Sequence, residues 1–249
     1  MPRRLAVVTG ASSGIGLALA RLLLREGWDV VAAGRDAARL TAGRPVACDL
    51  SRPEGVARLT SAIADQPVSL LVNNAGFGVH GRFARTDAAE ELALVSLQLS
   101  AALALSKAVL PGMLARREGT ILNVGSVYAF SPVPEQAVYG ACKAFLLSWT
   151  QALDAELSGT GARALAFCPG IVRTEFRARA GLSDKGALKG MSAEQAAEAA
   201  WRQVRAGTGV VVPGRGNKAF ALAARLAGGR GAAKFVGAVN RWRGLKSVA

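Results

Sequence analysis

Histidine and cysteine are scarce in this chain of 249 residues, which contains one histidine and three cysteines. Cys48, Cys142 and Cys168 are widely spaced, and none has a second cysteine or a histidine at the spacing of a metal-ligand pair. We therefore expect no zinc site. A sparse, odd set of cysteines is also untypical of a disulfide framework, so the sequence predicts buried thiols and a reducing compartment, the cytoplasm.

Long apolar runs are also lacking. No uninterrupted apolar segment approaches the roughly 20 residues that span a bilayer, and the apolar residues that follow Arg4 give way to a glycine-rich stretch at 9–16. We interpret this opening as a first strand, because a signal peptide would carry a longer apolar core.

Acidic residues are missing from the last part of the chain. The formal net charge is +14, and from Ala199 onward there are ten Lys or Arg and no Asp or Glu. Such a stretch could attract nucleic acid, an anionic membrane or an acidic substrate. No nucleic-acid-binding motif accompanies it. We therefore favour a solvated arginine-rich surface and expect no nucleic-acid partner.

The C-terminal extension, 215–249, contains a basic amphipathic pattern. Phe235, Val239 and Trp242 fall on one face of a helix predicted over 234–243, with Lys234 and Arg241 roughly opposite. The pattern permits contact with a membrane surface. We favour a helix that packs against its own domain or a partner subunit.

Short apolar runs alternate with helical patterns along most of the chain, which is typical of a parallel sheet wrapped by helices. With no internal repeat, long linker or change of composition before about residue 213, the sequence predicts a single α/β domain over 1–249. Its expected fold is a doubly wound, Rossmann-like, mostly parallel seven-stranded sheet with helices on both faces. The predicted strands are Leu5–Thr9, Asp29–Ala33, Arg44–Ala47, Ser69–Asn73, Gly119–Val124, Ala162–Phe167 and Gly209–Val212.

Two helix ends and one long loop can also be identified. A helix over 15–25 ends before Gly27, and Ser192 with Gln195 fits a capping box that opens another helix. The segment 176–191 is irregular and contains three glycines, so it is either a substrate loop or a disordered excursion at the surface.

The glycine-rich stretch lies between the first strand and the first helix, where a dinucleotide-binding loop is required. Glycine lets the backbone approach a pyrophosphate, and the amides of the helix N-terminus favour negative charge. The candidate cofactor-binding residues of this loop are Gly10, Ser12, Ser13, Gly14, Ile15 and Gly16.

The residues after the second strand bear on the choice of nucleotide. A basic side chain there neutralises a 2′-phosphate, whereas an acidic one holds a ribose hydroxyl. The segment reads Gly34-Arg35-Asp36. Arg35 favours NADP(H), and Asp36 leaves NAD(H) open.

Tyr139 and Lys143 are four residues apart, on one face of a predicted helix. A nearby cation favours a phenolate, which would lower the pKa of the tyrosine toward a useful range. Ser126 follows the strand that ends at Val124, at the edge where open α/β sheets bind ligands. Its hydroxyl could bind a carbonyl oxygen while Tyr139 transfers a proton.

Together these segments resemble the short-chain dehydrogenase/reductase family, and the resemblance extends to about Gly214. The matching pieces are Thr9-Gly10 with Gly14 and Gly16, Asp49, Asn73-Asn74-Ala75-Gly76, Ser126, Tyr139 with Lys143, and Pro169-Gly170 with Thr174. The resemblance implies an oxidoreductase that moves a hydride between nicotinamide and a small-molecule carbonyl or alcohol. It also implies a homodimer or homotetramer.

The family resemblance further implies a role for individual residues. Asp49, with Leu50 beside it, would contact the adenine, and Lys143 would hold the nicotinamide ribose and lower the pKa of Tyr139. Thr174 and Val172 would meet the nicotinamide carboxamide. The remaining cofactor-binding positions that it implies are Asn74, Ala75, Gly76, Tyr139, Pro169 and Gly170.

One position departs from the family pattern. Many members carry an asparagine in the helix before the serine, where it organises a proton relay, and counting back from Leu110-Pro111 puts Gln98 at this place. Glutamine keeps the amide on a longer arm. Gln98 is therefore a candidate catalytic residue of an altered relay.

Three other side chains and two other functions deserve mention. We expect His80 to be a solvated loop histidine, and Tyr128 and Ser131 either line a substrate cavity or pack in the core. The first alternative function is a nucleotide-binding scaffold with impaired catalysis. The second is a basic protein that docks on membranes or nucleic acid and uses the fold structurally.

Overall fold

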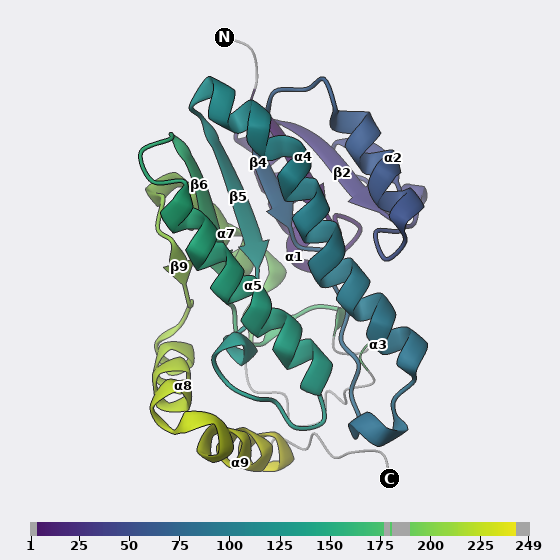
Figure 1. Cartoon of the computed structure of the whole chain (residues 1–249). Coiled ribbons are helices and arrows are strands. Elements are labelled where there is room, and N and C mark those ends of the chain that lie inside the picture. Colours follow the sequence, from purple (N-terminus) through teal and green to yellow (C-terminus); the bar gives the residue numbers. More distant parts are fainter. Residues whose placement is uncertain (1–3, 177–179, 181–189, 243–249) are drawn as a thin grey trace.

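The computed structural model describes residues 4–176, 180 and 190–242 of the chain (Figure 1). A sheet of seven parallel strands crosses the molecule in the order β3-β2-β1-β4-β5-β6-β9. All seven predicted strands are confirmed with small shifts at their ends. Their bounds are β1 Leu5–Thr9, β2 Asp29–Gly34, β3 Arg44–Ala47, β4 Val68–Asn73, β5 Gly119–Val124, β6 Ala162–Phe167 and β9 Val210–Val211.

Helices cover both faces of this sheet. α1 (Gly14–Arg25) and α7 (Ala193–Ala206) lie on one face, and α2 (Pro53–Ile63), α4 (Ala101–Arg116) and α5 (Ala137–Glu156) lie on the other (Figure 1). Along β1, Ala6 and Val8 pack in the first layer, whereas Leu5 and Val7 pack in the second. Strands buried on both faces need continuous apolar runs, which explains why they were visible in the sequence. The doubly wound α/β fold is confirmed.

The predicted ends of two helices are also confirmed. After α1 the chain turns at Gly27, whose φ is +82°, a left-handed conformation that favours glycine. At the start of α7 the Ser192 hydroxyl accepts from the Gln195 amide nitrogen, and the Gln195 side chain accepts from the Ser192 amide, completing the capping box.

One helix is longer and more apolar than the sequence led us to expect. α3 (Ala88–Val95), a π-helical turn η3 (Ser96–Ser100) and α4 run on as one helix of 29 residues, Ala88–Arg116, whose length and composition would allow it to cross a membrane. Polar residues scattered along it hid this in the sequence. In the structure Leu105, Val109 and Met113 pack against the sheet, so the helix contributes to the core of the domain.

The position of the site follows from the order of the strands. From β1 the chain builds outward through β2 and β3, and then returns to place β4 on the other side of β1. Open sheets bind ligands beyond the carboxyl ends of the strands at such a switch point. A buried amide pair ties the neighbouring strands together there, because Asn73 of β4 donates to Asn123 of β5 at 2.8 Å.

The segments after β6 complete the fold. Two short strands that were not predicted, β7 (Val172–Arg173) and β8 (Met191–Ser192), pair beside the sheet. Most of the predicted loop 176–191 lies outside the described residues. The C-terminal extension forms a helical hairpin of α8 (Arg215–Leu226) and α9 (Gly228–Trp242), drawn in yellow in Figure 1, and its last residues, 243–249, also lie outside the described part.

α9 packs against its own domain, which is the interpretation that we favoured, but through a different face. Its buried positions include Ala232, Val236 and Asn240. Phe235 lies at the edge of that face, 43% exposed, and its ring packs on Phe220 of α8. Of the predicted apolar face, Val239 is half-buried, and the side chain of Trp242 lies outside the described part.

Candidate active site

The glycine-rich loop runs from the end of β1 to the start of α1 and requires its glycines. Gly10 and Gly14 have φ values of +66° and +55°. A Cβ on Gly16 would overlap the Gly10 carbonyl oxygen, and one on Gly10 would lie 2.8 Å from Asn74 Nδ2. Ser13 precedes the first turn of α1, whose backbone N–H groups have no partner within the helix. The loop therefore combines close backbone approach with free donors, as a phosphate site needs.

Thr9, which the sequence analysis did not select as a site residue, fixes this loop to β4. Its hydroxyl donates to the Val72 carbonyl at 3.1 Å and accepts from the amides of Asn74 and Ala75, each at 3.0 Å. The Asn74 side chain donates back to the Thr9 carbonyl at 2.8 Å. In the sequence, the role of Thr9 was indicated only by its place as a polar residue at the end of an apolar strand.

Arg35 follows β2 and Asp49 follows β3. The two side chains are close enough to interact, and both line a cavity that extends along the glycine-rich loop. Burial opposes ionisation of Asp49, but hydrogen bonds from Ser51 and the positive charge of Arg35 hold its pKa below the ordinary value. Asp36 does not line the cavity. Its carboxylate instead accepts from the Ala38 amide at 3.0 Å and caps the short helix η1 (Ala37–Arg39).

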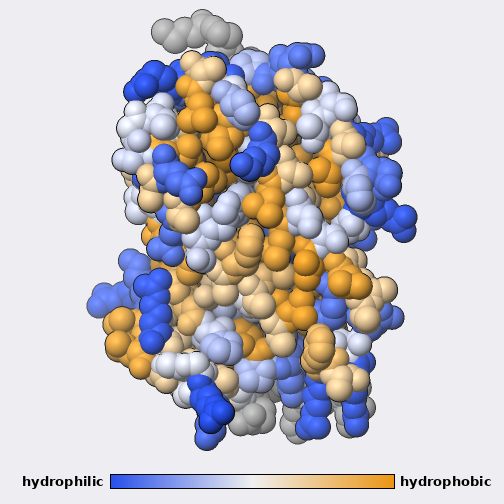
Figure 2. Space-filling view, in the orientation of Figure 1, coloured by the Kyte–Doolittle hydropathy of each residue, from blue (hydrophilic) through white to orange (hydrophobic). Residues whose placement is uncertain are grey.

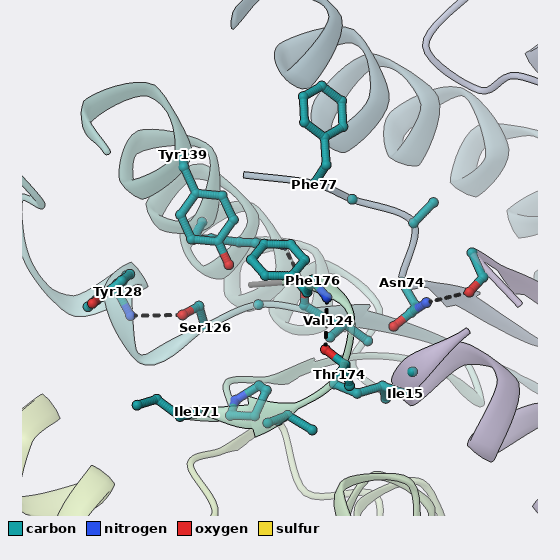
Figure 3. A pocket seen from close by; sticks show the side chains of 18 of the residues that line it. Ile15, Asn74, Phe77, Val124, Ser126, Tyr128, Tyr139, Ile171, Thr174 and Phe176 are labelled. Carbon is teal, nitrogen blue, oxygen red and sulfur yellow. Dashed lines mark hydrogen bonds between the residues drawn. The ribbon is translucent and has the colours of Figure 1, made fainter. Parts of the chain in front are cut away.

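Ser126, Tyr139 and Lys143 meet where β5 ends and α5 begins. In Figure 3 the hydroxyl groups of Ser126 and Tyr139 face the same space, with the ring of Phe176 beside Tyr139. The Lys143 ammonium lies 5.5 Å from the centre of the Tyr139 ring and donates to the Val124 carbonyl at 2.9 Å. All three side chains are buried, at 9%, 8% and 6% exposure respectively.

The charges of this cluster differ from the expectation drawn from the sequence. Burial raises the pKa of Tyr139 well above its ordinary value, although a hydrogen bond with the Ser126 side chain opposes the rise. Burial also lowers the pKa of Lys143 to about 8. Lys143 points its ammonium at a backbone carbonyl, so it does not make Tyr139 a phenolate in this structure. The raised pKa favours the neutral phenol of Tyr139, the form that carries a proton.

Gln98 is a buried residue of the π-helical turn η3 and does not line the same space as Ser126 and Tyr139. Its Nε2 donates to the Phe77 carbonyl at 2.8 Å. Its buried Oε1 has no hydrogen-bond partner among the described residues. Gln98 and Lys143 both border a small cavity of about 10 Å³, near the lower limit for a single water molecule.

A cavity of about 800 Å³ joins the glycine-rich loop to this cluster. Every predicted catalytic and cofactor-binding residue lines it except Gly16, which lies beneath the loop, and Gln98. Tyr128 also lines it, whereas Ser131 does not. Phe176 and Met191, the ends of the predicted substrate loop, line it too, whereas the lining residues that the sequence analysis missed include Phe77, Ile171, Asn217 and Phe220. Phe220 and Asn217 come from the C-terminal hairpin, and no local pattern says where a helix packs.

The single histidine and the three cysteines were not predicted to take part in this chemistry, although Cys48 lines the cavity. The His80 side chain is 7% exposed, so the expectation of a solvated histidine was wrong, and its Nε2 lies 3.7 Å from the Glu135 carboxylate. His80 does not line the cavity. The three cysteines are buried and unpaired, as predicted, and burial raises the pKa of the Cys168 thiol to about 11.

The fold and site together define a class of protein, the dinucleotide-binding oxidoreductases with a tyrosine and a lysine at the carboxyl edge of the sheet. Comparison with known proteins agrees: the sequence profile of the short chain dehydrogenase family matches residues 4–185. The chain belongs to the short-chain dehydrogenase/reductase family and is an oxidoreductase.

Individual relatives share most of their length with this chain. An uncharacterized oxidoreductase of Staphylococcus epidermidis is 32% identical over 206 residues, 79% of this chain and 88% of the relative. A 3-oxoacyl-acyl-carrier-protein reductase of Vibrio cholerae is 34% identical over 183 residues, 70% of this chain and 75% of the relative. A solved short-chain dehydrogenase from Sphingobium yanoikuyae in complex with NADPH is 32% identical, covers 88% of this chain and 92% of its own, and superposes with a TM-score of 0.82.

The cavity fits a dinucleotide. Its volume is within the range of about 300–1,000 Å³ typical of ligand pockets. At one end the glycine-rich loop, which has no space for a Cβ at Gly10 or Gly16, exposes its backbone next to the N-terminus of α1. At the other end Tyr139 and Lys143 provide a phenol and an ammonium.

The buried ammonium predicts a measurable cost in stability. Replacing Lys143 with Met should raise the free energy of unfolding at pH 7 by about 1–2 kcal/mol. This is less than the roughly 3 kcal/mol that a fall in pKa from 10.5 to about 8 implies, because the Val124 carbonyl loses its donor. Urea denaturation measures the difference.

The pH dependence has a definite sign. Below pH 8 Lys143 is charged in both states and the cost is complete, whereas between about 8 and 10.5 only the unfolded chain keeps the proton. The advantage of Lys143→Met should therefore shrink as pH rises through this window. Lys107→Met, at an exposed position of α4, serves as the control. A Lys143→Met protein that is less stable than the original at pH 7 contradicts the argument.

Proposed function

We propose that this chain is an NADP(H)-dependent reductase of small-molecule ketones or aldehydes, with Tyr139 as the proton donor. The observation that carries the proposal is the meeting of Ser126, Tyr139 and Lys143 in the cavity that begins at the glycine-rich loop. The opposite reaction, oxidation of an alcohol to a carbonyl compound, uses the same groups in reverse.

The preference for NADP(H) rests on Arg35. Its side chain lies at the end of β2, beside the loop, where it is available to a 2′-phosphate. Asp36, which left NAD(H) open in the sequence, is engaged as a helix cap and lies outside the cavity lining. Structural neighbours support this choice, because the Sphingobium yanoikuyae dehydrogenase is described in complex with NADPH.

The protonation state of Tyr139 favours reduction. Bound NADPH would supply a hydride to the carbonyl carbon of the substrate. As negative charge develops on the carbonyl oxygen, the Ser126 hydroxyl donates a hydrogen bond to it and Tyr139 transfers its phenolic proton. A neutral phenol, which burial maintains here, is the form that can give this proton.

Lys143 and Gln98 would assist the proton transfer by Tyr139. We infer that the Lys143 ammonium positions the nicotinamide ribose and stabilises the phenolate that is left when the proton has gone. The small cavity between Lys143 and Gln98 is the place for an altered proton relay, in which Gln98 Oε1 accepts and Lys143 donates.

The walls around Tyr139 point to a substrate with apolar substituents. Phe77 and Phe176 pack in one apolar cluster with Tyr139, and Ile171, Met191 and Phe220 line other parts of the cavity. Apolar pockets with a few placed polar groups are typical of small-molecule sites. Phe176 and Met191, the first and last residues of the predicted substrate loop 176–191, both line the cavity.

We also infer a homodimer or homotetramer in the cytoplasm. Figure 2 shows apolar residues along the face formed by α4 and α5. Leu114 of α4 and Phe145 of α5 are exposed, and Phe145 packs on Trp149. An apolar band of this kind suits a second copy of the chain. Light scattering should give at least twice the mass of the chain, and a monomer at micromolar concentration would contradict the inference.

The first test of the reaction is Tyr139→Phe, which removes one oxygen atom. Because the proton donor is lost while the cavity is kept, kcat/KM for NADPH-dependent reduction of a ketone and aldehyde panel should fall by about 100- to 10,000-fold. NADPH affinity, followed by fluorescence, should change little.

Ser131→Ala is the matched control, since its buried hydroxyl lies outside the cavity lining. Full activity in Tyr139→Phe would contradict the proposed proton donor. NADPH binding without turnover of any panel member by the unmodified protein would instead favour a nucleotide-binding scaffold.

The nucleotide preference has its own test. Arg35→Ala should weaken NADPH binding by about 10- to 100-fold, the value of a charge-assisted hydrogen bond, and leave NADH binding nearly unchanged. Arg25→Ala removes the same charge from the end of α1, away from the cavity. Equal losses for both nucleotides, or a loss in Arg25→Ala as well, would show that Arg35 does not select the phosphate.

A further inference from the structure

The C-terminal hairpin is a formed part of the structure, packed on one end of the domain. Figure 1 shows α8 and α9 at that end, where α8 packs against η4 (Val127–Phe130), the turn after β5. The Tyr128 hydroxyl donates to Asn240 Oδ1 of α9 at 2.9 Å. The Phe220 and Phe235 rings, one from each helix, lie 6.0 Å apart. The outer side of the hairpin is therefore a defined surface.

The outer side of α8 is more apolar than a solvent-facing helix surface should be. Ala221 and Ala224 form its buried side, and Phe220 lines the cavity. Away from these residues, Leu222 is 60% exposed and Leu226 is 79% exposed. Surface helices of globular proteins carry polar residues on the side that faces away from the core. The two leucines therefore need an explanation.

The same side of α8 is also basic. Residues three and four apart share a helix face, so Arg215, Lys218, Leu222 and Leu226 form one row, the α8 stripe. Figure 2 shows apolar residues, in orange, over α8, with hydrophilic residues, in blue, beside them. The hairpin contains no Asp or Glu. Its exposed basic residues are Arg215, Lys218, Arg225, Arg230 and Lys234.

The composition of the α8 stripe distinguishes the partners that could cover it. In a twofold contact the same surface of two copies meets itself, which would bring Arg215 and Lys218 of both copies together without an acid on either hairpin. Nucleic acid offers phosphates to the cations but leaves the leucines in water. An anionic bilayer offers phosphates and, directly beneath them, acyl chains. Only the bilayer matches both halves of the stripe.

We propose that the α8 stripe binds the surface of an anionic phospholipid membrane. Leu222 and Leu226 enter the boundary between headgroups and acyl chains, and Arg215 and Lys218 contact the phosphates. Phe220 lines the cavity from the other side of α8, so docking brings the cavity within about one helix diameter of the lipid. This would suit a substrate with apolar substituents. That last point alone rests on the proposed function, because membrane binding needs neither nucleotide nor substrate.

Vesicle binding by the full-length protein tests the proposal. The protein is mixed with vesicles of phosphatidylcholine, with or without phosphatidylglycerol, and the bound fraction is measured by co-sedimentation. We expect binding to the vesicles that contain phosphatidylglycerol and little binding to phosphatidylcholine alone. Raising the salt concentration should weaken the binding, because salt screens the attraction between the cations and the phosphates.

Variants at exposed positions separate the two halves of the stripe. Leu222→Ser combined with Leu226→Ser should weaken vesicle binding by about 10- to 100-fold, because two apolar side chains no longer leave water. Leu92→Ser in α3, where the leucine is 67% exposed, is the matched control and should bind like the unmodified protein. Lys218→Gln should weaken binding by about 5-fold, the value of one cation at an anionic surface. Arg25→Gln, at the end of α1, should have no effect.

Failure to bind anionic vesicles would overturn the proposal. So would vesicle binding that the double leucine variant retains in full, because the cations alone would then account for it. Binding to duplex DNA in place of vesicles would identify nucleic acid as the partner. A dimer that the double leucine variant converts to a monomer in light scattering, without vesicle binding, would show instead that the stripe joins two copies of the chain. None of these results depends on turnover, so the proposed function stands or fails separately.

Discussion

The Lys143 ammonium is the group on which the arrangement of the site depends. It is buried between the end of β5 and the cavity, and the Val124 carbonyl is its hydrogen-bond acceptor. Among the described residues no carboxylate forms a salt bridge with it. A buried cation without a counter-charge opposes folding. The packing of α5 against β5 and β6 must therefore hold Lys143 there, and the same helix carries Tyr139 one turn earlier.

The other parts of the site are held by the carboxyl ends of the strands. Thr9 fastens the glycine-rich loop to β4, and Asn73 fastens β4 to β5 through Asn123. Ser126 follows β5, so its hydroxyl lies at a fixed place relative to the loop. Rigid strands rather than loops thus set the distance between the nucleotide end and the phenol end of the cavity. This is the pre-organisation that a proton and hydride transfer requires.

Much of the fold could be predicted because burial on both faces leaves a plain signal. β1 is an apolar run as far as Val8, and residues that line the site come directly after the strands, with Gly10 after β1 and Gly125 and Ser126 after β5. Tyr139 and Lys143 were visible through helical spacing, and Arg35 through its place after β2. The spacing of residues along the sequence does not indicate how deeply a side chain is buried. The raised pKa of Tyr139 and the burial of His80 therefore could not be predicted.

The contacts of the C-terminal hairpin could not be predicted from the sequence. Periodicity indicated an amphipathic helix with Phe235 on its apolar face, and gave no sign that Asn240 is buried. A polar residue on a buried helix face is meaningful only when its partner is known, and Tyr128 lies far away in sequence. Phe220 likewise reaches the cavity from a helix that the family profile does not include. The residues that line the cavity from this hairpin are thus ones that sequence patterns do not locate.

The central claim is that a hydride passes from the nicotinamide to a carbonyl carbon in the cavity beside Tyr139. Transfer of an isotope label tests this claim most directly. The protein is incubated with NADPH that carries deuterium at the transferred position of nicotinamide C4, together with the ketone and aldehyde panel. The account predicts an alcohol product with deuterium on the carbinol carbon and none on its oxygen after exchange with water. Consumption of NADPH without deuterium in any product, or no consumption at all, would contradict it.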